Sequence, residues 1–345
     1  MFDIVVYPDA QLKQGRCQRT LVDYDSKKYY SEWEIVTDGV PQGSIFGPLL
    51  FLLYVNDIPN VISDISNPIL YADDTSLIIT NSDSQTFEKN INTAILQLNK
   101  WFKSNLLLLN LEKTYFLQFL TKNSRAIDLH ISYENRQISR IHSTKFLGLV
   151  IDDNLSWHCH IDQMIPKLNK ATYVIRILKP LLSLEALKTV YFATVHSIIS
   201  YGIIFWGIST NSKIIFKTQK RIIRIITNST NKDSCRDLFK KLGILPLQSQ
   251  YIFSLLMFVV KNKDFFKTNA DIHSFNTRFN HDLHIPVANL AAFQKGVWYA
   301  GIKVYNHLPL PLKHLSHDGF KFKAALKRFL LANSFYTLEE YYSWK

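Results

Sequence analysis

The pattern of hydrophobic and polar positions changes once along the chain, near residue 157. Before that point, short apolar runs alternate with turn-forming residues, which is typical of strands joined by tight turns. After it, apolar residues recur at helical spacing. These helical patterns cover residues 160–178, 184–206, 213–227 and 246–262, and they are broken by Pro180, Gly207 and Pro246. The sequence therefore predicts a mixed region of strands and helices followed by a mostly helical region.

Within the first region, residues 68–79 form two apolar runs around a polar centre, which predicts a tight hairpin of buried strands. Two helices are expected beside it. One begins at Pro48 and ends before Pro59, and the other has Ser82, Asp83 or Ser84 as its N-cap and closes at Asn105. Further extended segments are predicted at 34–37, at 115–120, and at 129–151 as a hairpin turning at residues 134–135. This order indicates an α+β layer, with helices on one face of an antiparallel sheet.

Composition and charge indicate which class of partner the chain could bind. The chain has 345 residues and 47% hydrophobic residues, which is enough to bury sizeable cores. We expect three parts, at 1–157, 158–240 and 241–345. The formal net charge of +12 fits a polyanionic partner such as nucleic acid, although a basic solvated surface explains the charge equally well.

The spacing of cysteine and histidine residues and the apolar stretches argue against several other classes of protein. Three widely separated cysteines support neither a disulfide framework nor a zinc site, and the 158–160 and 281–284 histidine groups lack four-ligand spacing. The first residues show neither a secretory nor a transit-peptide pattern, so an intracellular location, nucleus or cytoplasm, is expected. His196 interrupts the apolar run 190–208, which favours a buried helix and no membrane partner.

The sharpest candidate for chemistry is the pair Asp73 and Asp74 at the predicted hairpin tip. Mg²⁺ prefers hard oxygen ligands and is usually held by one or two carboxylates together with substrate phosphates. Alone, the pair is weak, because adjacent acidic residues in a turn are usually a solvated tip.

The surrounding motifs change that interpretation. Tyr71-Ala72-Asp73-Asp74 lies between apolar runs, and it follows the segment 39–51, GVPQGSIFGPLLF, and the segment 54–59, YVNDIP. Together these segments resemble reverse transcriptases of non-LTR retrotransposons, of the LINE or jockey-like type. The resemblance implies an RNA-directed DNA polymerase, with a partial polymerase palm built as an antiparallel sheet with helices on one face. A mostly α-helical thumb and a helical C-terminal region of unknown role would follow, and Mg²⁺, an RNA template, a DNA primer and deoxynucleoside triphosphates would be the cofactor and partners.

The resemblance also implies roles for single residues. Asp73 and Asp74 would bind the metal, and Lys113 in the segment 109–114 would protonate the leaving pyrophosphate. Gln42, Gly43, Tyr71 and Ala72 would contact the incoming nucleotide, and Phe146, Leu147 and Gly148 would form the hairpin called the primer grip. Without the family, Lys113 is a solvated loop lysine, and residues 41–43 are a turn before a helix.

A basic stripe is predicted on the helix at 213–227. It consists of Lys213, Lys217, Lys220, Arg221 and Arg224. Such a stripe can follow nucleic-acid phosphates without reading sequence, and the segment resembles the thumb of these enzymes. An ordinary solvated face is equally compatible with the pattern.

One expected element is missing from the pattern. The family palm carries a further Asp before the Gly39 loop, and Asp3 resembles it only superficially because no helical pattern follows at 7–19. We therefore expect an N-terminally truncated reverse transcriptase, without fingers or a third catalytic carboxylate, that is inactive alone. A nonenzymatic, basic nucleic-acid-binding remnant and a nonfunctional reading frame are the alternatives. The sequence leaves the oligomeric state open.

Overall fold

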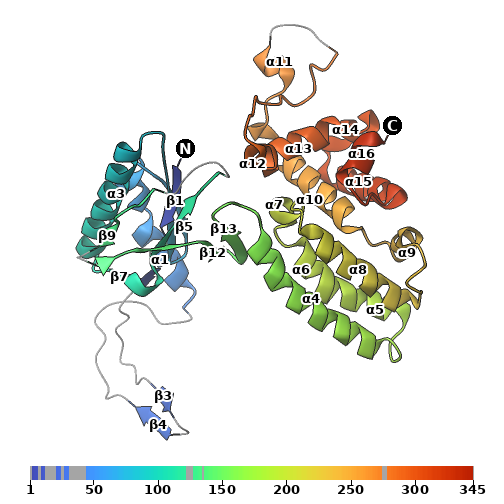
Figure 1. The fold of residues 1–345 in the computed structure, drawn as a ribbon, viewed down its shortest axis with the longest axis horizontal. Coiled ribbons are helices and arrows are strands. Elements are labelled where there is room, and N and C mark those ends of the chain that lie inside the picture. The colour runs from blue at the N-terminus through green and yellow to red at the C-terminus, as the bar shows by residue number, and fades with distance from the viewer. Residues whose placement is uncertain are drawn as a thin grey trace. The chain divides into compact units, whose positions relative to one another are not determined.

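The computed structural model describes residues 44–121, 127–133, 136–273 and 278–344 in full, and only the backbone of four early strands. These strands are β1 (Phe2–Val6), β2 (Asp9–Gln11), β3 (Leu21–Tyr24) and β4 (Lys27–Tyr30). The chain divides into two compact units (Figure 1). The sheet unit comprises residues 1–144 and 152–154, and the helical unit comprises residues 145–151 and 155–345.

The sheet unit is built on one main sheet, which is antiparallel as predicted except for one parallel pair. Its strands run in the order β11-β8-β1-β6-β2-β7, with β5 paired to β6. The bounds are β5 (Asn67–Tyr71), β6 (Asp74–Asn81), β7 (Leu108–Asn110), β8 (Tyr115–Phe119) and β11 (Ser139–Ile141). The pairs β1–β6, β1–β8, β2–β6, β2–β7 and β5–β6 are antiparallel, and β11 pairs with β8 in parallel.

Two helices of this unit, α2 (Ile58–Ile62) and α3 (Ser84–Ser104), pack against the sheet, whereas a third, α1 (Phe46–Val55), leaves most of its apolar residues exposed. Helix α3 begins at Asp83, whose side chain accepts the Thr86 N–H at 2.7 Å, and its apolar stripe lies in the core. Helix α1 begins before Pro48, and the predicted helix does end before Pro59, at Val55. Pro59 itself lies in the first turn of α2, where proline needs no N–H partner.

The segment 129–151 is more divided than one hairpin. Strands β9 (Ser132–Tyr133) and β10 (Arg136–Gln137) pair with each other, and β11 then joins the main sheet. Strands β12 (Ser143–Phe146) and β13 (Leu149–Asp152) form a second hairpin. The extended segment predicted at 34–37 lies outside the described residues.

The helical unit contains the long helices that the periodicity predicts. They are α4 (His158–Leu178), α5 (Leu184–Tyr191), α8 (Ser212–Thr227), α9 (Cys235–Leu242), α10 (Leu247–Lys261), α13 (Val297–Asn306) and α15 (Gly319–Asn333). Shorter ones are α6 (Ser197–Ser200), α7 (Ile203–Trp206), α11 (Asn269–Ile272), α12 (Ala291–Gln294), α14 (Leu310–His314) and α16 (Leu338–Ser343). One buried cluster extends from Leu149 to Tyr341, so residues on both sides of position 241 share a core.

The predicted helix at 184–206 is interrupted. A π-helical turn, Phe192–His196, follows α5, and the chain bends at Tyr201–Gly202, where Gly202 has φ +58°. No single helix among the described residues is long and apolar enough to cross a membrane, although the bent pair α9 and α10 passes that test together by length and composition. The residues of α10 that face the core are fully buried.

Candidate active site

The two predicted catalytic carboxylates lie where a tight turn exposes them. Strands β5 and β6 pair up to Tyr71 opposite Asp74, so Ala72 and Asp73 form the turn between them. Ala72 has φ +52°, the left-handed backbone that two-residue hairpin turns require. Asp73 and Asp74 are both exposed, and Tyr71 beside them is 61% exposed. The tip is therefore accessible to a ligand in solution.

Two neighbouring strands bring further residues to the same end of the sheet. Asp9 on β2 is in register with Asp74 on one side and with Asn110 on the other. Lys113, exposed and in the short turn after Asn110, therefore lies near the end of β7. Because β2 alone separates β6 from β7, the backbones of Asp74 and Asn110 are about 10 Å apart, two strand spacings. Asp74 and Lys113 thus belong to one region.

The register also separates the two early aspartates. Asp3 on β1 is in register with Thr80, at the opposite end of β6 from Asp74. Six residues of strand span roughly 20 Å, so Asp3 is remote from the hairpin tip. Asp9 is instead directly opposite Asp74. Sequence reasoning missed Asp9, since no motif surrounds it and only the strand pairing brings it to the site.

The donor set at the tip fits Mg²⁺. Asp73 and Asp74 offer two accessible carboxylates, the number that Mg²⁺ commonly takes from a protein when substrate phosphates and water complete its octahedron. Among the side chains that the structure describes, no group of three or more His, Cys, Asp or Glu residues is placed to hold a metal ion. The side chain of Asp9 is not among them.

The other predicted nucleotide contacts have different outcomes. Gln42 and Gly43 lie outside the described residues. Tyr71 and Ala72 are next to the aspartate pair in the β5–β6 hairpin, and both are exposed. The structure therefore brings together Asp73, Asp74, Tyr71 and Ala72 at one tip.

The predicted primer-grip residues form a second hairpin turn, and it belongs to the helical unit. Phe146 ends β12, and Leu147 and Gly148 are the two turn residues, with φ +45° and +84°. Positive φ at both positions is the geometry of a type I′ turn, which suits glycine well and costs a residue with a side chain about 1–2 kcal/mol. Leu147 and Gly148 are exposed, whereas Leu149 and Val150 are buried behind them.

The basic stripe on α8 separates into two groups. Lys213 and Lys217 are exposed, and Lys220 lies over the Phe216 ring at 4.8 Å. Arg221 donates to the Asn169 side chain of α4 at 2.9 Å, and Arg224 donates to the Asp233 carbonyl at 3.0 Å. Lys220, Arg221 and Arg224 therefore also stabilise the fold. Among the hydrogen bonds, ion pairs and ring contacts described, Lys213 and Lys217 have no contact of this kind.

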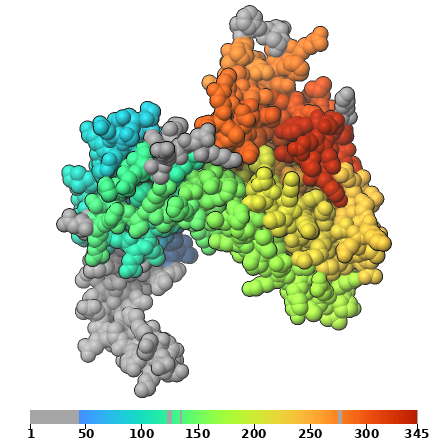
Figure 2. Space-filling model, in the orientation of Figure 1, coloured from blue at the N-terminus to red at the C-terminus, as the bar shows by residue number. Residues whose placement is uncertain are grey.

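A further basic face lies on α4 and was not predicted. Lys167, Lys170 and Arg176 are exposed, and so are their neighbours Tyr173 and Ile177. No acidic residue occurs on this helix after Asp162, which His158 pairs at 2.7 Å. The outer side of α4 is uncovered in the space-filling view (Figure 2). The lack of acidic residues after Asp162 was visible in the sequence and is the signal that could have found these cations.

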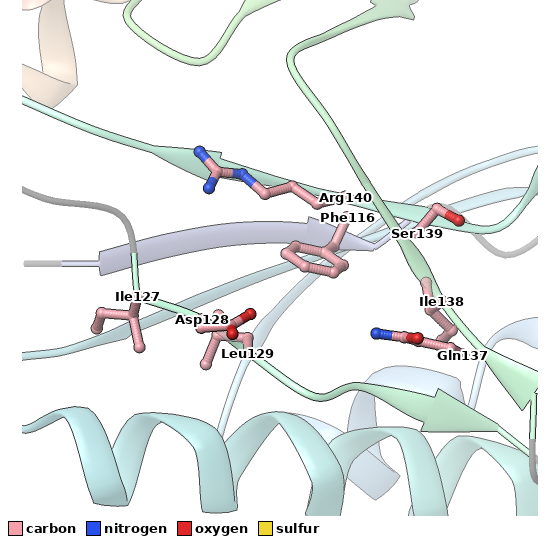
Figure 3. A pocket seen from close by; sticks show the side chains of 8 residues that line it. All are labelled: Phe116, Ile127, Asp128, Leu129, Gln137, Ile138, Ser139 and Arg140. Atoms are coloured by element: carbon pink, nitrogen blue, oxygen red, sulfur yellow. The ribbon is translucent and has the colours of Figure 1, made fainter.

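A pocket of about 440 Å³ lies elsewhere in the sheet unit, between β8, residues 127–129 and residues 137–140, in and between β10 and β11. Phe116, Asp128, Gln137 and Arg140 are among its lining residues (Figure 3). The Arg140 guanidinium is 4.0 Å from the Asp153 carboxylate. We assign no site to it.

Comparisons with known proteins agree with the motifs. Residues 9–151 match the family described as reverse transcriptase (RNA-dependent DNA polymerase). The chain is 29% identical over 210 residues to the probable RNA-directed DNA polymerase from transposon BS of Drosophila melanogaster, covering 58% of this chain and 23% of that protein. It is 23% identical over 230 residues to the RNA-directed DNA polymerase from the mobile element jockey of the same organism, covering 64% and 25%. The chain thus spans about a quarter of these relatives, and the resemblance to LINE-type reverse transcriptases is confirmed.

Proposed function

Because residues 9–151 carry a reverse transcriptase domain, we propose that this chain is part of an RNA-directed DNA polymerase of a non-LTR retrotransposon. The observation that supports it most is the exposed Asp73–Asp74 tip with two strand ends beside it, one carrying Asp9 and the other leading to Lys113. In this proposal the sheet unit is the palm, and the first helices of the helical unit are the thumb.

The metal ligands in this proposal are Asp73 and Asp74, and Asp9 is the candidate for the third carboxylate. When bound, Mg²⁺ supplies activation of the attacking 3′-hydroxyl and stabilisation of the leaving pyrophosphate. The register of Asp9 with Asp74 supports this assignment over Asp3, whose register partner is Thr80. Asp9 would thus fill the position that the sequence motifs leave empty.

The remaining residues bind and orient the substrates. Lys113 gives a proton to the leaving pyrophosphate, a step for which a positioned lysine is suited. Gln42, Gly43, Tyr71 and Ala72 contact the incoming deoxynucleoside triphosphate. The exposed Leu147–Gly148 turn contacts the primer strand, and cations on α4 and α8 follow the phosphates of the duplex of RNA template and DNA primer.

Primer extension tests this function. The purified chain is incubated with Mg²⁺, nucleotides and a primed RNA template, alone and fused to an upstream segment from a relative. We expect extension by the fusion, and weaker extension by the unfused chain, which spans about a quarter of its relatives. Asp73→Asn should abolish extension by the fusion, whereas Asp64→Asn, at another exposed carboxylate of the sheet unit, should not. Extension that survives Asp73→Asn would refute the proposed site.

A nonenzymatic nucleic-acid-binding protein is the second candidate, and the net charge of +12 and the uncovered basic face of α4 favour it. It predicts duplex binding that Asp73→Asn leaves unchanged and no extension by any fusion. A fusion that extends primers would reject it as the sole function of the domain.

A further inference from the structure

The exposed turn Leu147–Gly148 has a backbone conformation that a leucine disfavours, and contacts from another part of the chain stabilise it. Leu147 has φ +45°, and strained positions of this kind persist only where surrounding contacts fix them. Those contacts come from the bend between α6 and α7, 54 positions further along the chain.

Tyr201 supports the turn itself. Its hydroxyl donates a hydrogen bond to the Leu147 carbonyl. A Cβ atom on Gly148 would lie 3.1 Å from the Tyr201 hydroxyl oxygen and 3.2 Å from Cε1 of the ring, so the tyrosine packs closely against this glycine. The indole N–H of Trp206, which is fully buried, donates to the Tyr201 carbonyl at 3.0 Å and fixes the backbone of the bend.

Two more residues fix the strand that follows the turn. A Cβ atom on Gly202 would lie 2.6 Å from Cδ2 of Leu149, so this glycine permits close packing of the bend on β13. The Val150 N–H donates to Nδ1 of the buried His160 at 3.3 Å. The turn is therefore bonded at Leu147, packed at Gly148 and Leu149, and bonded again at Val150.

The same helical segment holds the chain where it returns from residues 152–154. The Ser209 hydroxyl donates to the Ser156 carbonyl at 2.8 Å, and Phe205 stacks on Trp157 with ring centroids 6.1 Å apart. Residues 201–209 thus contact both segments of chain that flank residues 152–154. The hairpin turn is fixed by the helical unit, to which residues 145–151 belong.

We propose that Tyr201, Gly202 and His160 form a positioning clamp that sets the Leu147–Gly148 turn for contact with the primer strand. This inference rests on the proposed function, because the primer is the partner that the turn would meet. The three residues act through the turn and are positioning residues. The clamp predicts that the turn loses its defined conformation when the Tyr201 hydroxyl is removed, while the helical core stays intact.

Amide hydrogen exchange tests the clamp. Tyr201→Phe removes one hydrogen bond and keeps the ring, so exchange at Gly148 and Leu149 should accelerate by roughly two- to tenfold. Tyr173→Phe, at an exposed tyrosine of α4, is the matched control and should leave these amides unchanged. Amides of α10 report on the core and should be unaffected in both. Unchanged exchange at the turn in Tyr201→Phe would overturn the proposal.

His160 supplies an independent variant pair. His160→Phe removes the acceptor of the Val150 N–H, and His160→Gln can restore an acceptor. Exchange of the Val150 amide should accelerate in His160→Phe and should be slower in His160→Gln than in His160→Phe. A loss of packing alone does not explain this difference. Equal acceleration in both variants would count against a positioning role for His160.

Photocrosslinking separates the clamp from the primer contact. A primer with a 4-thiothymidine at its 3′ end is bound to a template and irradiated with the full chain. The unsubstituted chain should crosslink within residues 146–149, and Tyr201→Phe should lower that yield while duplex affinity changes by less than about twofold. If exchange responds but the unsubstituted chain never crosslinks there, the primer contact is refuted and the proposal with it.

Discussion

Replacing Asp9 and Asp3 one at a time tests the assignment of the third carboxylate most directly. Both aspartates lie in early strands of the same sheet, so each is a control for the other. In the structure Asp9 is in register with Asp74, and Asp3 with Thr80. We predict that Asp9→Asn weakens divalent-metal binding and that Asp3→Asn does not.

The expected magnitudes follow from these positions. Loss of an outer-shell partner typically lowers metal affinity about 10- to 100-fold, so loss of a ligand at Asp9 should cost at least roughly tenfold. Asp3 lies roughly 20 Å from the site along β6. At that distance a unit charge and a divalent ion interact in water by about 0.4 kcal/mol before salt screening, and at physiological ionic strength most of this is lost. Asp3→Asn should therefore change the affinity by less than about twofold.

Electron paramagnetic resonance of free Mn²⁺ provides the assay, since bound Mn²⁺ loses the sharp six-line signal. Titrations would compare the unsubstituted chain with Asp9→Asn, Asp3→Asn and Asp73→Asn, and circular dichroism would check that each variant is folded. Asp73→Asn should lower the affinity as Asp9→Asn does. If Asp9→Asn binds Mn²⁺ like the unsubstituted chain while Asp73→Asn does not, then Asp9 is not a ligand. An effect of Asp3→Asn alone would refute the strand register.

Three further predictions concern the helical unit. Replacing Lys213 and Lys217 with Gln should flatten the slope of log affinity against log salt for duplex binding by roughly one to two units, at about 0.9 per phosphate contact, and an unchanged slope would mean that these lysines face only solvent. Burial lowers the pKa of His160 and His196 below 6.5 in the folded chain, so the unfolded chain binds more protons and the free energy of unfolding should fall as the pH drops below that value. Urea denaturation at pH 7.5 and 5.5 measures this fall, which should be smaller in His160→Gln than in the unsubstituted chain. The Gln219 side-chain amide forms hydrogen bonds with the Tyr191 hydroxyl, the Leu245 carbonyl and the Leu247 N–H. Gln219→Leu leaves these buried groups without partners, so it should lower the free energy of unfolding, measured by urea titration, by about 2–6 kcal/mol. A decrease of less than about 1 kcal/mol would contradict this reasoning.

Local pattern predicted most of the individual elements. The helices α3, α4, α8 and α10 occur where apolar residues repeat at helical spacing, because one face of each is buried. The β5–β6 hairpin was also visible, because two apolar runs flank a two-residue turn. The prediction that both strands are buried was wrong for β5, none of whose residues is buried. Local pattern missed the second role of Pro59: it follows the end of α1, as predicted, but it also lies in the first turn of α2.

The candidate site was only partly predictable. Asp73, Asp74 and Tyr71 are adjacent in sequence, so a motif could identify them. Asp9 and Lys113 reach the same region through β2 and β7, and strand pairing of this kind depends on contacts between distant segments. The sequence likewise did not show which cations of α8 face solvent and which bind neighbouring segments. That division depends on the positions of their partners Asn169 and Asp233.

By itself, then, the sequence determined the elements, the exposed aspartate pair and the resemblance to LINE-type reverse transcriptases, because these depend on residues close together in the chain. The tertiary structure decided which early aspartate stands opposite Asp74, and that the Leu147–Gly148 turn is fixed by Tyr201 and His160. Each of these contacts joins segments far apart in sequence. Its formation depends on how whole strands and helices pack, which no local pattern of residues encodes.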